Sequence, residues 1–246
     1  MEKLGHVSIA SINRQIIRKY TEERQALGRS DATVRTELIF LSAALNHVRK
    51  EGWIDKAPHI DKPPPPPPRQ HVANQKEIRR FLDRIDLPHL MLFSLLALHT
   101  LSRKMAVLEL KWDQVDFQTG LIDFNPKGRT RTIKRRVPVP INKTLRTVLQ
   151  KAWEGRDTEY VVELNGKPLL DIKKSFATAA RRAGIEWLTP HVLRHTGATL
   201  MAMEGVAMTQ ISGIMGDDVA TVTKHYLKYH PDYLREATNA LDKLYG

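Results

Sequence analysis

The stretch from Leu188 to Tyr226 reads LTPHVLRHTGATLMAMEGVAMTQISGIMGDDVATVTKHY and predicts three consecutive helices. Pro190 suits the start of the first helix, because proline is tolerated in a first turn. Gly205 ends that helix, and a second short helix fits Met208–Met215. Gly216 then turns the chain into a third helix, which ends with the stretch.

Three side chains in this stretch can carry chemistry: His191, Arg194 and Tyr226. His191 and Arg194 are three residues apart, so they share one helix face. A histidine and an arginine one turn apart usually form only a solvated face. The functional interpretation therefore depends on further pieces along the chain.

The composition favours a polyanionic partner. The 246 residues include 39 Lys and Arg against 27 Asp and Glu, for a net charge of +12. Such a balance suits nucleic acid or an anionic membrane surface. The sequence has no apolar run long enough to span a bilayer, no secretory signal pattern and no cysteine. We expect a cytoplasmic protein that acts on DNA or RNA.

A run of six prolines, Pro63–Pro68, separates two parts of the chain. Proline cannot donate to helix or sheet, so the run favours an extended polyproline II rod. An SH3-ligand role is conceivable, but the position favours a semi-rigid linker. We therefore predict a helical N-terminal domain at 1–62, a linker at 63–69 and a second domain at 70–246.

The second domain is predicted to be mostly α with a small β-sheet, an α+β fold. A short strand at Ile122–Phe124 pairs with Arg136–Pro140, whose prolines confine it to an edge. The other predicted elements are helices at Ser11–Leu27, from Ser30 or Asp31 onward, from Asn74 or Gln75 onward, at His89–Thr100, Met105–Trp112, Thr144–Trp153, Ile172–Ala183 and Pro231–Leu244, and a strand at Tyr160–Leu164.

The segment between the paired strands, Pro126–Arg136, is strongly basic and has no acidic residue. On a tight hairpin, such a density of charge should lie against phosphates. The candidate nucleic-acid contacts are Arg129, Arg131, Arg135 and Arg136, together with Arg35 in the N-terminal domain.

Taken together, these pieces resemble the tyrosine recombinases, the phage integrase family. That family has an H-x-x-R motif, a G-H-S-like turn about twenty residues on, and a nucleophilic tyrosine ten residues after that glycine. Gly216 and Tyr226 keep the last interval. Arg103 stands where the family has an arginine after a T-G-x turn and before a Leu-x-Leu-x-Trp segment. The N-terminal part resembles the family's helical core-binding domain.

The hairpin resembles the family's strand pair that carries a lysine before a turn glycine. Lys127-Gly128 fits this pattern, and Lys134 is the competing candidate. Two positions depart from the family. Asp217 stands where the family usually has His or Trp, and Ala106 stands where an acid is frequent. An ionised carboxylate would repel a phosphate, so Asp217 puts catalytic competence in doubt; Asp217 or Asp218 could instead cap the following helix.

The resemblance implies a site-specific recombinase or integrase that cuts and rejoins DNA through a 3′-phosphotyrosyl link. Tyr226 would be the nucleophile, and Arg103 and Arg194 would hold the phosphoryl oxygens. His191 would bond the phosphate or accept the tyrosine proton, and Lys127 would protonate the leaving oxygen. No metal, ATP or other cofactor is expected.

Two other functions compete: a DNA-relaxing enzyme of the type IB topoisomerase kind, and a non-catalytic DNA-binding protein. The expected partner is double-stranded DNA, clamped between the two domains. The expected assembly is a homotetramer on paired DNA sites, formed from free monomers in the bacterial cytoplasm and at the nucleoid. The last helix, Pro231–Leu244, would dock into a neighbouring protomer or complete its own core.

DNA affinity should fall steeply with salt, because binding by a chain of charge +12 displaces counterions from many phosphates. Neutralising Arg129, Arg131 and Arg135 together should make the dependence shallower. The measurement is the slope of log affinity against log salt between about 50 and 200 mM. A flat response would contradict the electrostatic account.

Overall fold

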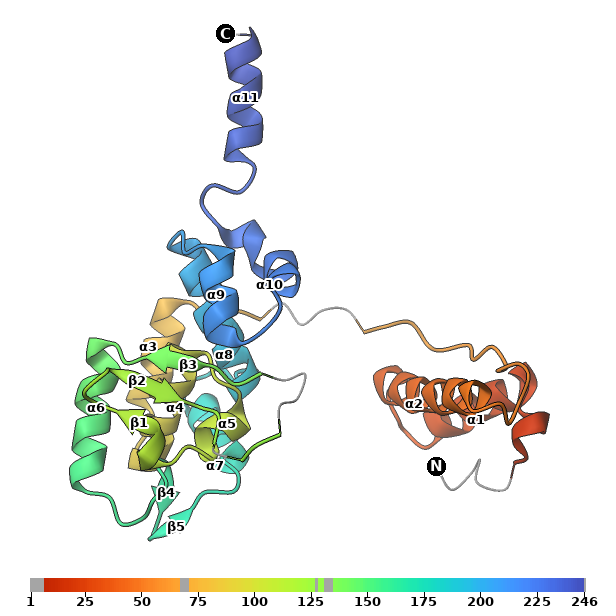
Figure 1. Cartoon of the computed structure of the whole chain (residues 1–246), viewed down its shortest axis with the longest axis horizontal. Helices are drawn as coiled ribbons and strands as arrows, with labels where there is room; N and C mark the ends of the chain where they lie inside the picture. The colour runs from red at the N-terminus through yellow and green to blue at the C-terminus, as the bar shows by residue number, and fades with distance from the viewer. Residues whose placement is uncertain (1–6, 67–70, 127, 131–134, 246) are drawn as a thin grey trace. The chain divides into compact units, whose positions relative to one another are not determined.

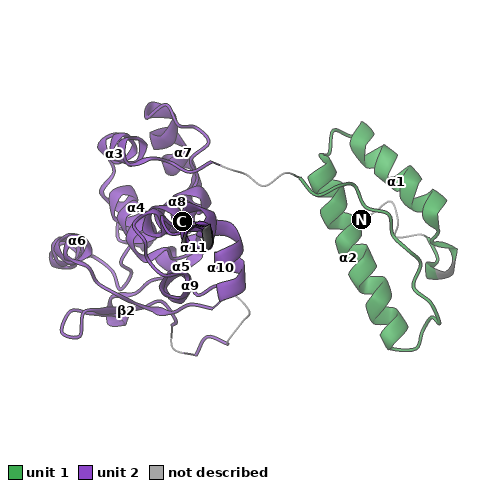
Figure 2. Ribbon diagram, turned by 90° about the horizontal axis from the view of Figure 1, so that it is seen from above, with its two compact units in different colours: residues 1–70 green, residues 71–246 purple. Residues whose placement is uncertain are grey.

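The computed structural model describes residues 7–66, 71–126, 128–130 and 135–245 (Figure 1). The chain divides into two compact units, residues 1–70 and residues 71–246, which are coloured separately in Figure 2. Among the described residues, no helix has the length and apolar character needed to cross a membrane.

Unit 1 contains the short 3-10 helix η2 (Ile9–Ser11) and two long helices, α1 (Arg14–Ala26) and α2 (Asp31–Lys50). The first long helix begins later than predicted, because the Asn13 side chain accepts from the backbone of Ile16 and caps it. Ser30 caps α2 in the same way. The buried side chains between the helices include Ile17, Tyr20, Val34, Leu38 and Leu45.

Polar contacts tie the two helices of unit 1 together at a half-buried position. Glu37 of α2 accepts hydrogen bonds from Arg24 and, at 2.9 Å, from the hydroxyl of Tyr20. The hydrogen bond from Arg24 is the main cause that lowers the pKa of Glu37. Arg35 donates to the backbone oxygen of Pro63 at 2.5 Å, so it fastens the start of the proline run to α2.

Unit 2 is mostly helical and has two small antiparallel sheets, which confirms the predicted fold class. Its elements in chain order are α3 (Gln75–Asp83), α4 (Pro88–Thr100), α5 (Lys104–Leu108), η3 (Trp112–Gln114), β1 (Val115–Asp116), β2 (Leu121–Asp123), β3 (Pro138–Pro140), α6 (Lys143–Glu154), β4 (Glu163–Leu164), β5 (Lys167–Pro168), α7 (Lys173–Arg182), α8 (Pro190–Met203), α9 (Met208–Met215), α10 (Val219–Tyr226), η4 (Leu227–Tyr229) and α11 (Arg235–Tyr245).

The larger sheet has the order β1-β2-β3, so the proline-containing strand β3 lies at an edge as predicted. Ile122 of the central strand pairs with Val115 on one side and Val139 on the other. These three side chains are buried, whereas Pro138 and Pro140 are exposed. The edge position suits β3 because proline has no N–H to donate to a further strand.

The largest errors in the predicted extent of elements of unit 2 concern one strand and two helices. The helix expected to reach Trp112 ends at Leu108, because the backbone of residues 110–112 pairs with residues 159–161 instead. For the same reason the strand predicted at Tyr160–Leu164 is reduced to Glu163–Leu164, which pairs with β5. The last helix begins at Arg235 and not at Pro231, after Leu234 adopts a φ of 62°.

The core of unit 2 is organised around α4, whose sequence, PHLMLFSLLALHT, is apolar on nearly all sides. Its side chains Leu90, Phe93 and Leu96 are almost completely buried. Helices α6 and α8 both pack against α4. A second cluster lies between α8, α9 and α10, and its members include Leu101, Ala198, Ile211 and Tyr226. The end of α8 is less buried, since Met203 is 48% exposed.

Helices α4 and α8 approach closely at Gly197. A Cβ atom added there would lie 2.5 Å from Cδ2 of Leu101 and 2.9 Å from the backbone oxygen of Leu98. A backbone atom cannot rotate away, so the two helices would have to separate. Gly197 therefore sets the spacing of the helix that carries Arg194.

Gly197→Ala should destabilise the protein by about 1–3 kcal/mol, because it overpacks the α4–α8 contact. Gly213→Ala is the matched control. It lies inside α9 with nothing within 4 Å of the added Cβ, so it should stabilise by about 0.5–1 kcal/mol. Urea unfolding measures the stability of both variants. Equal changes in stability would show that the close α4–α8 contact does not require glycine at position 197.

Candidate active site

Arg194 lies in the first half of α8, and its guanidinium is buried. The helix begins with Pro190 after Thr189, whose hydroxyl caps it by accepting from the backbone of Val192. The Arg194 side chain is only 4% exposed. It donates to the backbone oxygen of Leu101 and, at 3.0 Å, to that of Met215. These carbonyl groups, at the ends of α4 and α9, fix the guanidinium in position.

Burial is the main cause that lowers the pKa of Arg194, and the charge of Asp217 partly offsets it. A buried charge is costly unless it is paired and hydrogen-bonded. Arg194 satisfies both conditions. Its burial also shows that it is not part of a solvated helix face, the usual interpretation of such a pair.

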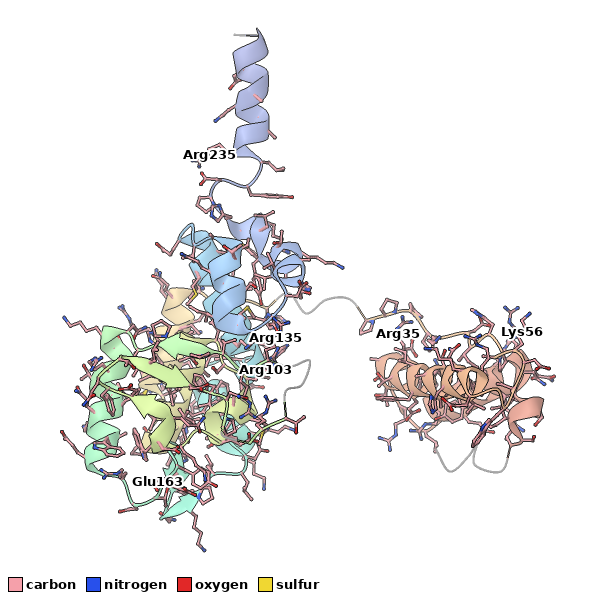
Figure 3. All side chains as sticks on the ribbon, in the orientation of Figure 1. Arg35, Lys56, Arg103, Arg135, Glu163 and Arg235 are labelled. Carbon is pink, nitrogen blue, oxygen red and sulfur yellow. The ribbon has the colours of Figure 1, made fainter. Side chains whose placement is uncertain are left out.

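Arg103 comes directly before α5, at the end of a tight turn. Leu101 ends α4 with a φ of 51°, in the left-handed region, at the position where the resembling family has glycine. Arg103 then donates from Nη1 to the backbone oxygen of Arg135 at 3.0 Å, and the two residues are labelled in Figure 3. The turn thus aims Arg103 at the same place as Arg194.

Asp217 lies between the two arginines. One carboxylate oxygen accepts from Nη2 of Arg103, and the other accepts from Nη2 of Arg194 at 2.5 Å. Asp218, in contrast, caps α10 by accepting from the backbone of Thr221 at 3.0 Å. Of the two predicted capping candidates, Asp218 is therefore the cap and Asp217 is part of the site.

Gly216 makes this arrangement sterically feasible. It ends α9 with a φ of 64°, and an added Cβ would lie 3.0 Å from the backbone oxygen of Arg135. The turn between α9 and α10 therefore lies against the chain segment that leads into β3. The hydroxyl of Ser212 also donates to the backbone oxygen of Asp217 at 2.9 Å.

Tyr226 ends α10 and is 4% exposed. Its hydroxyl contacts Nδ1 of His195, and Nε2 of His195 lies 2.9 Å from Nε2 of His191. His195 was not assigned a role from the sequence. The signal was the second histidine of HVLRH, four residues after His191 and so on the same helix face.

The surroundings of His195 and Tyr226 favour the neutral form of each side chain. Burial, followed by the nearby charges of His191 and Arg194, lowers the pKa of His195 to about 4. Burial raises the pKa of Tyr226 to about 12. The tyrosine hydroxyl therefore needs a base if it is to act as a nucleophile.

A cavity of about 260 Å³ lies beside the two arginines. Its lining is rich in guanidinium groups: Arg103, Arg129, Arg135, Arg136 and Arg194. Arg136 is also paired with Glu109 at 2.5 Å, and its side chain is only 12% exposed. Such a cavity suits an anion of phosphate size.

Four predicted site residues need separate mention. Lys127, Lys134 and Arg131 lie outside the described residues. Arg35 is half-buried against Pro63 in unit 1, where it has a structural contact. Its role in DNA binding stays a prediction.

Two arginines converge on the Asp217 carboxylate next to a buried tyrosine and two histidines, and these side-chain types are suited to phosphodiester chemistry. Residues 72–232 match the Phage integrase family, so the chain belongs to this family and is a tyrosine recombinase, an enzyme class that breaks and rejoins DNA.

Relatives of known activity support this assignment. The chain is 28% identical over 230 residues to the integrase of Salmonella phage P22, covering 87% of this chain and 58% of that protein. It is also 28% identical over 222 residues to the tyrosine recombinase XerA of Thermococcus kodakarensis, covering 85% of this chain and 77% of that protein. The chain thus spans less than two thirds of the phage protein.

Solved structures share the fold at low sequence identity. The Tn1549 transposon integrase in complex with transposon right end DNA matches with a TM-score of 0.77 at 16% identity, covering 98% of this chain and 89% of that one. A lambda integrase dimer bound to a core site matches with a TM-score of 0.67 at 17% identity, covering 85% of this chain and 80% of that one.

The protonation of His195 should contribute to acid sensitivity. Its pKa is about 4 in the folded protein and near the ordinary 6.5 when unfolded, so between these values only the unfolded chain binds the proton. Stability should therefore be lost as the pH falls from about 6.5 towards 4. His195→Asn should lose less stability than the wild type between pH 7 and pH 4.5 in urea unfolding. An equal loss in both proteins would contradict the depressed pKa.

Proposed function

We propose that this chain catalyses site-specific DNA recombination, with Tyr226 as the nucleophile and Arg103 and Arg194 as the phosphate ligands. The observation that carries the proposal is the convergence of both guanidiniums on the two oxygens of one anionic group. A non-bridging pair of phosphate oxygens offers the same recognition pattern.

In the proposed reaction, the hydroxyl oxygen of Tyr226 attacks the phosphorus atom and the 5′ oxygen of the next nucleotide leaves. The product is a 3′-phosphotyrosyl link and a free 5′ hydroxyl. Attack by a 5′ hydroxyl of another strand then releases the tyrosine. The link conserves the phosphodiester bond energy, so rejoining needs no ATP. Arg103 and Arg194 stabilise the negative charge that develops on the phosphoryl oxygens.

His195 is the proposed first acceptor of the tyrosine proton, because it contacts the hydroxyl; the negative charge of a phosphate bound beside it would raise its pKa from the value of about 4 in the DNA-free protein. If Nδ1 of His195 accepts from Tyr226, then its Nε2 carries the proton and can donate to Nε2 of His191. His191 is exposed, so a proton passed along this pair would reach solvent. His191 would thus accept the proton indirectly, through His195. The same side chain could also donate a hydrogen bond to the phosphate, as the sequence suggested.

Lys127 is the proposed general acid for the 5′ oxygen, with Lys134 as the alternative. The proposal rests on the sequence pattern Lys127-Gly128 in the hairpin between β2 and β3. The described residues Arg129 and Arg135, which are close to the two lysines in sequence, line the cavity beside the arginine pair, and this supports the proposal.

The proposed partner is double-stranded DNA, and the proposed assembly is a homotetramer on paired sites. The DNA partner is supported by the Tn1549 integrase structure with transposon right end DNA and by the lambda integrase dimer bound to a core site; the homotetramer rests on the family resemblance. The described side chains of α11, such as Arg235 and Ala237, are exposed, which leaves this helix available for docking in a neighbouring protomer. A non-catalytic DNA-binding protein is the second candidate, favoured only by the occupation of the arginines by Asp217.

Tyr226→Phe should abolish the covalent protein–DNA adduct on nicked duplexes taken from the DNA that flanks the gene. Binding to the same duplexes should be nearly unchanged, because only one hydroxyl is lost. Denaturing electrophoresis detects the adduct. A persistent adduct would assign the nucleophile to another residue, such as Tyr229 or Tyr233, and the absence of an adduct in the wild type would favour the non-catalytic protein.

Lys127→Ala should slow cleavage more than Lys134→Ala, because only the first removes the proposed acid. A duplex with sulfur in place of the leaving 5′ oxygen should restore the rate of Lys127→Ala, since a thiolate leaves without a proton. Single-turnover rates on both duplexes measure the effect. Rescue of Lys134→Ala instead would make Lys134 the acid.

A further inference from the structure

The contact between Asp217 and the arginine pair has a consequence for DNA binding. The carboxylate of Asp217 gives one oxygen to Arg103 and the other to Arg194. Its side chain is 24% exposed, whereas that of Arg194 is 4% exposed. Asp217 is therefore more accessible than the buried Arg194, although less so than Arg103, whose side chain is 35% exposed.

A carboxylate and a phosphodiester share the property that matters to a guanidinium. Each presents two oxygen atoms that share one negative charge, and arginine recognises both with its planar fork of N–H donors. The two arginines that bind Asp217 also line the cavity beside them, so a phosphate held there would draw on the same two guanidiniums. An N–H donor that is bonded to Asp217 is not free for a phosphate, and the two anions would also repel each other.

The arginines do not depend on Asp217 alone for their positions. Arg194 keeps the backbone oxygens of Leu101 and Met215, and Arg103 keeps that of Arg135. The backbone of Asp217 is likewise held by Ser212, at 2.9 Å. Rotation of the Asp217 side chain would therefore release two pre-arranged guanidiniums without a change in the backbone.

We propose that Asp217 is an internal competitor for the scissile phosphate, which occupies both arginines in the DNA-free protein and must leave before cleavage. The proposal rests on the proposed function of the arginine pair. A phosphate would have to displace Asp217 before it could bind the arginines. Binding of the scissile phosphate would therefore depend on additional contacts between the protein and the rest of the DNA.

The test compares Asp217→Asn with Asp218→Asn in the full chain. Both variants remove one negative charge, and asparagine at position 218 can still cap α10. The probe is inorganic phosphate, titrated by calorimetry at constant ionic strength. Asp217→Asn should bind phosphate at least about tenfold more tightly than the wild type, because a charge within contact distance of both arginines is removed. Asp218→Asn should bind like the wild type.

A further variant locates the bound phosphate. In the Asp217→Asn background, Arg103→Ala should remove the gain in affinity. If the gain remains, the phosphate binds elsewhere and the proposal is wrong. The proposal is also wrong if Asp217→Asn binds phosphate no better than Asp218→Asn, or more weakly, since Asp217 would then be needed to hold the arginines in position.

The folding of the variants is part of the test. Asp217→His supplies a second replacement, in case the amide alone disrupts the cluster. If circular dichroism shows that neither variant folds, Asp217 is a structural partner of buried Arg194 and the proposal is overturned. Phosphate binding needs no DNA cleavage, so a failure of the proposed recombinase activity would appear separately, as the absence of a covalent adduct.

Discussion

The structure of unit 2 depends on the buried guanidinium of Arg194. Its donors contact the backbone oxygens of Leu101 and Met215 and the carboxylate of Asp217, which come from two segments, the turn after α4 and the end of α9 with the turn that follows it. Removing one partner of a buried charge typically costs about 3–5 kcal/mol, so these segments are strongly coupled. The same contacts that stabilise the fold arrange the site, because the turn after α4 also carries Arg103 and the turn after α9 leads to Tyr226.

The sequence predicted most of this arrangement where local rules decide the outcome. Helix α9 has the predicted bounds, and α10 ends at Tyr226 as predicted, because Gly216 and the cap at Asp218 are local signals. The end of α5 was missed, because its backbone pairs with residues 159–161, which are distant in sequence. Local propensity contains no information about such a partner.

The site was predicted as a set of residues but not as a set of contacts. The pairing of Arg103, Arg194 and Asp217 joins positions separated by up to 114 residues, which spacing alone cannot establish. His195 was missed because a histidine next to an arginine has no distinctive pattern, and its contact with Tyr226 exists only when α8 and α10 pack together. Asp217 appeared in the sequence as a departure from the family, and its contacts give that departure a physical interpretation.

The central proposal is that Tyr226, positioned by this cluster, is the nucleophile whose hydroxyl oxygen becomes bonded to the DNA phosphate. The most direct measurement is mass spectrometry of the peptide that remains linked to nucleotide after digestion of a trapped wild-type complex. The account predicts a single nucleotide-bearing peptide, with the phosphodiester on the Tyr226 oxygen. A nucleotide on Tyr229, Tyr233 or any residue other than Tyr226 would contradict it.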